Sequence, residues 1–261
     1  MSRYRIEAGT AQHVGNRPRQ NDRAAVFTAP NAPGYVLAVV GDGGADNPAG
    51  AEQLLQTARH ALDDLRPGST PDVERLTRLL HDIALETHEL LLMNPLAAAS
   101  DARSTMALLL LTPAHQAIWA TVGDTRLYRF ADGACTGRTD DTDYIDHLVA
   151  VDKLPVEAAR KHRASRLLNN VLGNRLKAPF VTTGAQQELQ AGAGFMLCTD
   201  GLWPWFADSE LAAAVTRRTP REAAGLLVDK ARERAQGKGD NCTMAIVRLV
   251  VADVGKPGTG T

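Results

Sequence analysis

The sequence predicts an α+β protein in which helices are segregated from mainly antiparallel sheets. Two apolar segments with β-branched or aromatic residues, at 35–40 and 195–199, each run into an Asp-Gly pair, as buried strands do when they enter a turn. Strand-like segments separated by short turns lie between them, and a pair of helix-like segments follows each. A doubly wound parallel fold would instead alternate single strands with single helices. The order of segments therefore favours antiparallel sheets that are flanked by helices.

The first half of the chain combines one buried strand with two helices. The strand at 35–40 (YVLAVV) ends at GDGG, residues 41–44, so that an acidic residue stands at the strand end. Helix-like periodicity follows at 49–65 and 72–93, where apolar residues recur at steps of three and four. The Thr70-Pro71 pair predicts an N-cap and a first-turn proline for the second helix.

The middle of the chain changes to the period of strands. Turn residues at Pro113-Ala114 and Gly123-Asp124 separate three expected strands, which are residues 105–112, 116–122 and 126–130. This pattern predicts a β-meander that is followed by another turn at Asp132-Gly133.

The second half begins with an excursion that is expected to pack beside the sheet. Residues 139–174 lack strand character and contain short helical patches at 155–162 and 165–172. After the strand at 195–199, two helices are expected. The second of them opens with TPRE, residues 219–222, which combines a capping box with a first-turn proline. A last strand is expected at 243–251.

Composition and charge exclude several classes of protein. The chain has 261 residues and a net charge of −1, which leaves no surplus charge to bind nucleic acid or an anionic membrane. No segment is expected to cross a bilayer or to direct export. No linker is visible, so residues 1–254 are expected to form a single domain with a flexible tail at 255–261. The three scattered cysteines suit a reducing, cytoplasmic location.

Four aspartates lie at expected strand ends beside a small or amide residue. They are Asp42, Asp124, Asp200 and Asp240. Carboxylates that are brought together repel one another unless cations neutralise them, and hard divalent ions such as Mg²⁺ or Mn²⁺ take oxygen ligands of this kind. The alternative for each aspartate is a turn or cap, because Asp accepts hydrogen bonds from main-chain N–H groups in turns.

An ordered set of motifs identifies a resemblance to a known family. The motifs are GNRPRQNDR (15–23), VGDGG (40–44), STMA (104–107), VGDTR (122–126), NVLG (170–173), CTDGLW (198–203) and GDNCTM (239–244). In this order they resemble the metal-dependent type 2C (PPM) serine/threonine protein phosphatases, in particular the compact bacterial single-domain members. The resemblance spans residues 9–250, and its specificity comes from the ordered set rather than from any one motif.

The resemblance implies a four-layer α-β-β-α sandwich with a metal centre for two or three Mn²⁺ or Mg²⁺ ions at one end of the sheets. It implies that Asp42 bridges two ions and that the Gly43 carbonyl completes the shell of the second. Asp200 and Asp240 correspond to the remaining ligands of the first ion. Asp124 corresponds to a ligand that shares a third, weaker ion with Asp200.

The resemblance also implies hydrolysis of phosphoserine and phosphothreonine in proteins by direct attack of a metal-bridging hydroxide. Arg17 corresponds to the arginine that binds the substrate phosphate, since a guanidinium suits phosphate oxygens. Asp22 corresponds to the aspartate that orients the attacking water, and residues 142–174 to a flap beside the site. A cognate Ser/Thr kinase is the expected partner. This reaction needs no phospho-enzyme, and Cys198 lies inside an apolar strand, so it is expected to be a core residue rather than a nucleophile.

The chain departs from the family pattern at three places. Gly44 stands where eukaryotic relatives carry a histidine that is suggested to protonate the leaving group. Asn21 stands where the family often has Glu, so the site loses one negative charge, which weakens the case for tight binding of the second ion. The loop at 44–47 replaces the usual Met-Gly-Gly stretch but remains polar and contains glycine.

The histidines have no metal-ligand spacing. His13 precedes the arginine motif and is expected to be a surface or capping residue. His147 and His162 fall in the flap segment, and His162 belongs to a basic stretch that is expected to be solvated.

Two alternative functions stay open. Asn21 and the altered loop suit a catalytically weak or inactive binding module on the same fold. The acidic set also suits a two-metal phosphodiesterase or nuclease, although the balanced charge offers little attraction for a polyanion.

Overall fold

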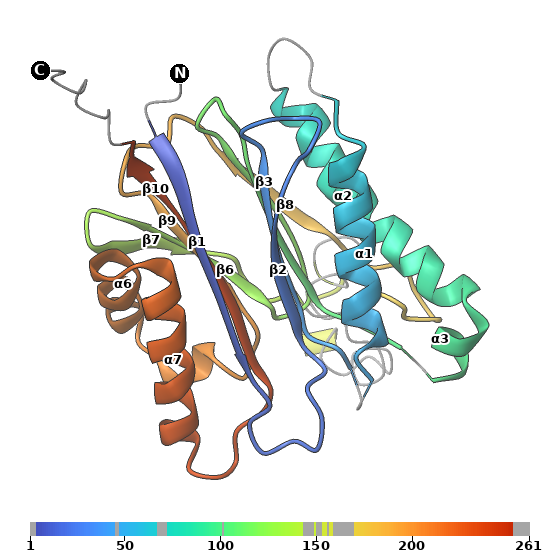
Figure 1. Cartoon of the computed structure of the whole chain (residues 1–261). Helices are drawn as coiled ribbons and strands as arrows, with labels where there is room; N and C mark the ends of the chain where they lie inside the picture. Colours follow the sequence, from blue (N-terminus) through green and yellow to red (C-terminus); the bar gives the residue numbers. More distant parts are fainter. Residues whose placement is uncertain are drawn as a thin grey trace, which may run out of the picture.

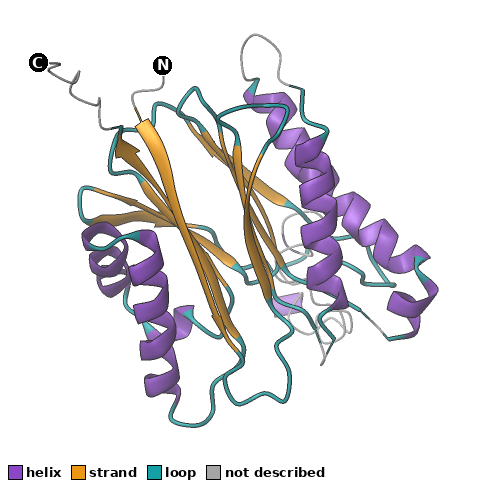
Figure 2. Cartoon of the chain, in the orientation of Figure 1, coloured by secondary structure: helices purple, strands orange, loops and turns teal. Residues whose placement is uncertain are grey.

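Two five-stranded antiparallel sheets are stacked face to face, and helices cover the outer face of each (Figures 1 and 2). The computed structural model describes residues 4–44, 47–66, 72–100, 102–142, 149, 153–155, 157–158 and 170–252. The first sheet has the order β1 (Tyr4–His13), β10 (Cys242–Val251), β9 (Gly194–Cys198), β6 (Arg126–Ala131) and β7 (Ala134–Arg138). The second has the order β2 (Arg23–Thr28), β3 (Val36–Gly41), β4 (Met106–Leu111), β5 (Ala117–Val122) and β8 (Thr182–Gln186).

The helices complete a four-layer α-β-β-α sandwich, as the resemblance implies. The second sheet is covered by α1 (Ala49–Asp63) and α2 (Val73–Met93), with the short α3 (Pro95–Ala99) after them. The first sheet is covered by α6 (Asp208–Arg217) and α7 (Pro220–Ala235), which follow a 3-10 helix at Trp203–Trp205.

Central strands are apolar on both faces because each face packs against a different layer. In β3, Val36, Ala38 and Val40 point between the two sheets, whereas Leu37 and Val39 point toward α1 and α2. The same alternation occurs in β4 and β10. The strands are thereby fixed in register, since a slip of one residue would exchange the two faces.

Most predicted elements are confirmed, and one predicted helix cap is wrong. The strands β3, β4, β5, β6, β9 and β10 and the helices α1, α2, α6 and α7 lie where the sequence predicts them. The capping box of α7 is also present, because Thr219 Oγ1 accepts a hydrogen bond from Glu222 N at 3.3 Å. In contrast, α2 is capped by Asp72, whose Oδ1 accepts a hydrogen bond from Glu74 N at 3.0 Å, whereas the predicted cap Thr70 and Pro71 lie outside the described residues.

The predicted β-meander is wrong in its third strand. The strands β4 and β5 pair in the second sheet, but β6 belongs to the first sheet, where it pairs with β7 and β9. The turn at Gly123-Asp124 therefore carries the chain from one sheet to the other instead of closing a hairpin. This crossing places Asp124 between the ends of the two sheets.

Most of the segment 142–174, predicted as a flap, lies outside the described residues, as do most of the two predicted helical patches and the whole tail at 255–261. The described end of the second patch is not helical, because Leu172 forms a β-bridge with Ser104. In the part of the chain that the structure describes, every helix is too short or too polar to cross a bilayer.

Candidate metal centre

The structure brings the predicted carboxylates to one end of the two sheets, the end at which β1 finishes and β10 begins, which is at the bottom of Figure 1. In the second sheet, Arg23 pairs with Gly41, so Asp22 and Asp42 stand on neighbouring strand ends. In the first sheet, β9 and β10 are antiparallel, so Asp200, which follows β9, and Asp240, which precedes β10, lie at the same end. Antiparallel pairing thus converts residues that are far apart in the sequence into neighbours.

Asp22, Asp42 and Asp200 form a tight carboxylate cluster. Asp42 lies within hydrogen-bonding reach of the other two carboxyl groups. Burial raises the pKa of all three groups, and repulsion by Asp22 and Asp200 raises the pKa of Asp42 further. Without a cation, the cluster therefore retains protons at pH values where isolated carboxyl groups are ionised.

Threonines beneath the cluster fix its two most buried members. The side chain of Asp22 is 1% exposed, and its Oδ2 accepts a hydrogen bond from Thr199 Oγ1 at 2.9 Å. The main-chain N of Asp42 donates to Thr105 Oγ1 at 3.2 Å. The first bond orients the Asp22 carboxylate, and the second fixes the main chain at Asp42.

Arg17 and Asp240 form an ion pair at the mouth of the site. Arg17 lies in the loop between β1 and β2, and its Nη2 is 2.5 Å from Asp240 Oδ2. Their side chains are 55% and 38% exposed. An ion pair with this exposure contributes at most about 1 kcal/mol, so a divalent cation or an anion can compete for either partner.

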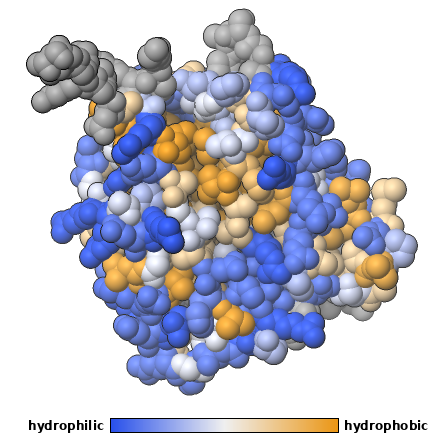
Figure 3. Space-filling view, in the orientation of Figure 1, coloured by the Kyte–Doolittle hydropathy of each residue, from blue (hydrophilic) through white to orange (hydrophobic). Residues whose placement is uncertain are grey.

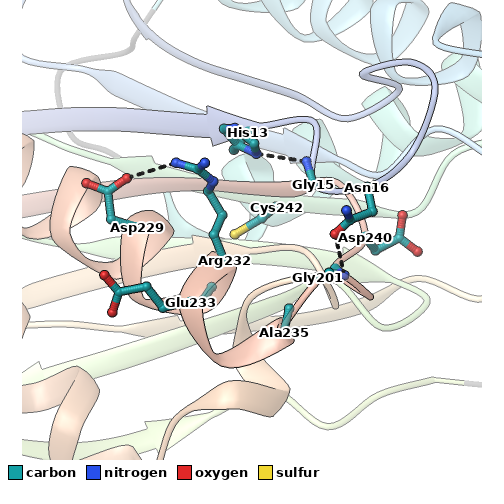
Figure 4. A pocket seen from close by; sticks show the side chains of 13 residues that line it. His13, Gly15, Asn16, Gly201, Asp229, Arg232, Glu233, Ala235, Asp240 and Cys242 are labelled. Carbon is teal, nitrogen blue, oxygen red and sulfur yellow. Dashed lines mark hydrogen bonds and ion pairs between the residues drawn. The ribbon is translucent and has the colours of Figure 1, made fainter.

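A cavity of about 170 Å³ lies between these groups. It is lined by Arg17, Asn21, Asp42, Gly43, Gly44, Asp240 and Asn241. A larger hollow of about 480 Å³ adjoins it at Asp240 and extends along the C-terminal part of α7 (Figure 4). The surface at this end is mainly hydrophilic in Figure 3, whereas an apolar hollow of about 270 Å³, which Tyr4 and Leu249 help to line, lies near the opposite end.

The donor atoms at this cavity fit a hard divalent cation. They are carboxylate, amide and main-chain oxygens, which Mg²⁺ and Mn²⁺ prefer. The side chain of Asn21 is 6% exposed, and its Oδ1 has no hydrogen-bond partner among the described residues. Gly43 is packed so closely that a Cβ there would lie 2.6 Å from the Asn21 carbonyl oxygen. A buried oxygen without a partner is unfavourable unless a ligand satisfies it.

The side chains do not yet form a complete ligand shell. Across the described ranges, no group of three or more His, Cys, Asp or Glu side chains is arranged to hold a metal ion. The ion pair between Asp240 and Arg17 accounts for part of this, because it directs one oxygen of Asp240 toward the guanidinium. The other oxygen of Asp240 accepts a hydrogen bond from Asn241 N at 2.7 Å, so a cation would have to share Asp240 with one of these two partners.

Asp124 lies next to the cluster rather than inside it. Burial raises its pKa, and its charge in turn contributes to the raised pKa of Asp200. It lines a separate hollow of about 310 Å³ together with Thr142 and Asn170. This position differs from that of the other four aspartates.

Asn241 is a structural residue of the site that the sequence analysis did not identify. Its Oδ1 accepts a hydrogen bond from Asn21 N at 2.6 Å, and its Nδ2 donates to the carbonyl oxygens of Val14 and Arg19 at 2.8 and 2.9 Å. Asn241 thereby attaches the whole Arg17 loop to the start of β10. Its place in the GDN motif, next to an expected ligand, is the sequence feature that could have identified it.

The predictions for His13 and Cys198 agree with the structure. His13 Nδ1 accepts a hydrogen bond from Gly15 N at 2.8 Å, so the ring caps the turn after β1 (Figure 4). Cys198 is fully buried in the core between the first sheet and its helices. Burial raises the pKa of its thiol, which makes it a poor nucleophile. His147 and His162 lie outside the described residues.

Comparison with known proteins identifies phosphatases. The serine/threonine protein phosphatase PstP of Mycobacterium tuberculosis is 26% identical over 241 residues, which cover 91% of this chain and 44% of PstP. The serine/threonine phosphatase stp of Listeria monocytogenes is 23% identical over 257 residues, 97% of each chain. The chain thus spans less than half of PstP but nearly all of stp. No protein-family profile matches it.

Solved structures share the fold over nearly the whole chain. A serine/threonine phosphatase of S. agalactiae has a TM-score of 0.72 at 19% identity and covers 94% of this chain and 99% of its own. PppA, described as a regulatory component of T6SS in Pseudomonas aeruginosa, has a TM-score of 0.66 at 25% identity, with 94% and 97% covered. The catalytic domain of PstP with two manganese ions has a TM-score of 0.66 at 21% identity, with 94% and 98% covered. These findings confirm the fold that the motifs imply and the resemblance to PPM phosphatases.

Proposed function

We propose that this chain hydrolyses phosphoserine and phosphothreonine in proteins with Mn²⁺ or Mg²⁺. It has the fold of the PPM phosphatases, and serine/threonine phosphatases are among its relatives. The observation that carries the proposal is the meeting of Asp22, Asp42, Asp200 and Asp240 at one end of the sandwich, with Arg17 at its mouth. Buried carboxylates with raised pKa values are a feature of functional sites more than of structural turns.

The charged residues of the site divide into two proposed roles. Asp42, the Gly43 carbonyl, Asp200 and Asp240 would hold two cations, and Asp124 together with Asp200 would hold a third. The chemistry that such ions supply is activation of water and neutralisation of charge on the phosphoryl group. The PstP structure with two manganese ions supports Mn²⁺ as the ion to test first.

Arg17 and Asp22 are proposed to act on the substrate and on water. The Arg17 guanidinium is exposed at the mouth and offers parallel N–H donors to two phosphate oxygens. When it binds phosphate, it releases Asp240. Asp22, which is held by Thr199, accepts a hydrogen bond from the attacking water and so directs it toward phosphorus.

Hydrolysis of p-nitrophenyl phosphate and of a phosphothreonine peptide, with and without Mn²⁺, tests the proposal. We expect turnover that depends on the cation. Absence of turnover at every Mn²⁺ concentration would favour the binding module, and faster hydrolysis of bis-p-nitrophenyl phosphate than of the monoester would favour a phosphodiesterase. The proposed partners are phosphoproteins and the Ser/Thr kinase that phosphorylates them, and the proposed location is the cytoplasm, where the three free cysteines would stay reduced.

Asn21→Glu is expected to lower the Mn²⁺ concentration that gives half-maximal activity. Asn21 lines the cavity together with Gly43, and its buried Oδ1 has no hydrogen-bond partner among the described residues, so a carboxylate there would add a negative charge near the proposed second ion. A unit charge a few ångströms from a dication is worth about 1 to 4 kcal/mol before its desolvation is subtracted. A Mn²⁺ titration of activity measures the change.

Asn16→Asp is the matched control for this charge. Asn16 lies in the same loop, and its Oδ1 accepts a hydrogen bond from Gly239 N at 3.1 Å, which a carboxylate can also do. An equal gain in both variants would mean that only the net charge matters. An unchanged requirement in Asn21→Glu would mean that residue 21 does not face the cation.

Asp124→Ala is expected to reduce turnover while the two tighter ions still bind. Asp124 lies beside Asp200 but outside the tight cluster, so its loss removes only the weaker proposed site. Isothermal calorimetry of Mn²⁺ binding, combined with kcat at saturating Mn²⁺, checks this. Loss of a tight ion in the variant would contradict the assignment.

A further inference from the structure

Three connected side chains, those of Arg126, Asp141 and Trp203, lie next to Asp124. Arg126, the first residue of β6, places its guanidinium over the Trp203 ring, with Cζ 3.3 Å from the ring centroid. Its Nε and Nη2 donate to the two carboxylate oxygens of Asp141 at 2.6 and 2.7 Å. The Arg126 side chain is only 13% exposed. A guanidinium that is both stacked and bound by a fork of two hydrogen bonds is held in one orientation.

This group is tied directly to the main chain of Asp124. Trp203 Nε1 donates to the Asp124 carbonyl oxygen at 3.1 Å. Trp203 begins the 3-10 helix that follows Asp200. Its bond to Asp124 therefore joins the two segments that contain the proposed ligands Asp200 and Asp124. The orientation of the Trp203 ring is set in turn by Arg126 and Asp141.

The residue before Asp124 is fixed from the other side. Thr142 N donates to the Gly123 carbonyl oxygen at 2.8 Å, and Gly123 N donates to Thr142 Oγ1 at 3.0 Å. Thr142 is the neighbour of Asp141 in the sequence. The turn that crosses between the sheets is therefore held at Gly123 and at the Asp124 carbonyl by residues of one connected network.

Such a restraint is needed because the two carboxylates repel each other. Arg126 pairs with Cys198, so Asp124 and Asp200 each lie two residues beyond this pair, at the same end of the antiparallel strands β6 and β9. Side chains on separate turns would move apart to lower this repulsion, unless the main chain is held. Affinity for an ion shared by two carboxylates depends on keeping them at a suitable distance.

We propose that Arg126, Asp141 and Trp203 form a clamp that holds Asp124 beside Asp200 and thereby sets the affinity of the weakest of the proposed cation sites. This inference rests on the proposed function, in which Asp124 and Asp200 share that ion. The three clamp residues are positioning residues, since they act through the main chain of Asp124.

Two variants weaken the clamp without removing its bulk. Trp203→Phe keeps a ring beneath Arg126 but removes the Nε1 donor to Asp124. Arg126→Lys keeps the charge but removes the fork to Asp141 and the planar stack. Their matched controls are Trp205→Phe, on the same 3-10 helix, and Arg129→Lys, whose guanidinium carbon lies 5.1 Å from the centroid of the Trp119 ring.

Calorimetric titration of each variant with Mn²⁺ tests the clamp. We expect the weakest site to lose about 3- to 10-fold in affinity in Trp203→Phe, the effect of one lost hydrogen bond, while the tight sites stay as in the controls. Clamp variants that titrate as the controls do would overturn the inference. Equal weakening of all sites would also overturn it, because it would indicate a general structural role.

Two further measurements keep these outcomes distinct. If wild-type protein neither binds Mn²⁺ nor hydrolyses p-nitrophenyl phosphate, the proposed function fails rather than the clamp. If Arg126→Lys does not fold, as thermal unfolding would show, the comparison of Trp203→Phe with Trp205→Phe decides alone. The kinetics add a second readout: we expect kcat at fixed Mn²⁺ to fall in Trp203→Phe, KM for the phosphopeptide to stay unchanged, and excess Mn²⁺ to restore kcat.

Discussion

Asp42→Asn is expected to abolish cation-dependent hydrolysis and at the same time to raise the stability of the cation-free protein. Asp42 is buried against Asp22 and Asp200, and burial and like charge both raise its pKa. An amide of the same shape removes the charge that the protein must otherwise bury or neutralise with a proton. Relief of even one to two pKa units corresponds to about 1 to 3 kcal/mol in the free energy of unfolding.

The raised pKa values of the cluster predict that the stability of the cation-free protein depends on pH. Burial and neighbouring charges raise the pKa values of Asp22 and Asp200 from 3.8 to about 6 in the folded state. When the pKa of a carboxyl group is higher in the folded than in the unfolded protein, its protonated form stabilises the fold. This stabilisation is complete at pH values below the pKa in the unfolded protein, and it is lost as the pH rises through the pKa in the folded protein. The cation-free wild type should therefore lose stability between about pH 4 and pH 6, with further loss above pH 6 from Asp42.

Chemical denaturation of cation-free protein at pH 5 and pH 8 measures both expectations. The wild type should lose more stability than Asp42→Asn between these pH values. Asp132→Asn serves as control, because Asp132 occupies the left-handed position of the β6–β7 turn, which Asn also tolerates, and lies outside the carboxylate cluster. A variant that loses both its fold and its activity would mean that Asp42 is a structural turn residue.

The sequence predicts the central strands of both sheets but not their edges. The six strands that it identifies include the buried β3, β4 and β9, whose apolar runs are visible without any structure. The four strands that it misses, β1, β2, β7 and β8, are the outermost strands of the two sheets. Edge strands are partly exposed, so a segment such as TTGAQ in β8 carries no apolar run.

The crossing between the sheets could not be predicted from turn residues. Gly123 has a φ of +85°, which a hairpin turn and a crossing turn both permit. What decides between them is the pairing of β6 with β9, a contact with a strand that lies far away in the sequence. Local sequence identifies the turn, and only tertiary packing decides where the next strand goes.

The carboxylates of the site were predictable, whereas their supports were not. Strand ends beside glycine identify Asp42 and Asp200 from sequence alone. The roles of Asn241 and Thr199 depend on hydrogen bonds across 220 and 177 residues of sequence, which no local pattern encodes. The ion pair between Arg17 and Asp240 is equally non-local and joins two residues for which the sequence predicts different ligands.

Arg17→Ala is expected to raise KM for a phosphothreonine peptide by about 10- to 100-fold, the effect of losing a charge-assisted pair of hydrogen bonds. The same substitution should not weaken the binding of Mn²⁺. In the cation-free protein, Arg17 occupies Asp240, and the loss of this competitor leaves the carboxylate available to a cation. Mn²⁺ affinity should therefore be unchanged or higher in the variant, although the loss of an arginine weakens substrate binding.

Arg19→Ala is the matched control, because Arg19 is exposed in the same loop and contacts Asn241 through its main-chain carbonyl, which alanine retains. Kinetics with the phosphopeptide and calorimetry with Mn²⁺, each on both variants, separate three cases. A raised KM with undiminished Mn²⁺ affinity in Arg17→Ala alone identifies a phosphate ligand that competes with the cation for Asp240. Weaker Mn²⁺ binding would instead mean that the ion pair orients Asp240 for the cation. Each of the two substitutions removes one positive charge from the same loop. An equal rise of KM in both variants would therefore mean that Arg17 acts only through the positive charge of the loop.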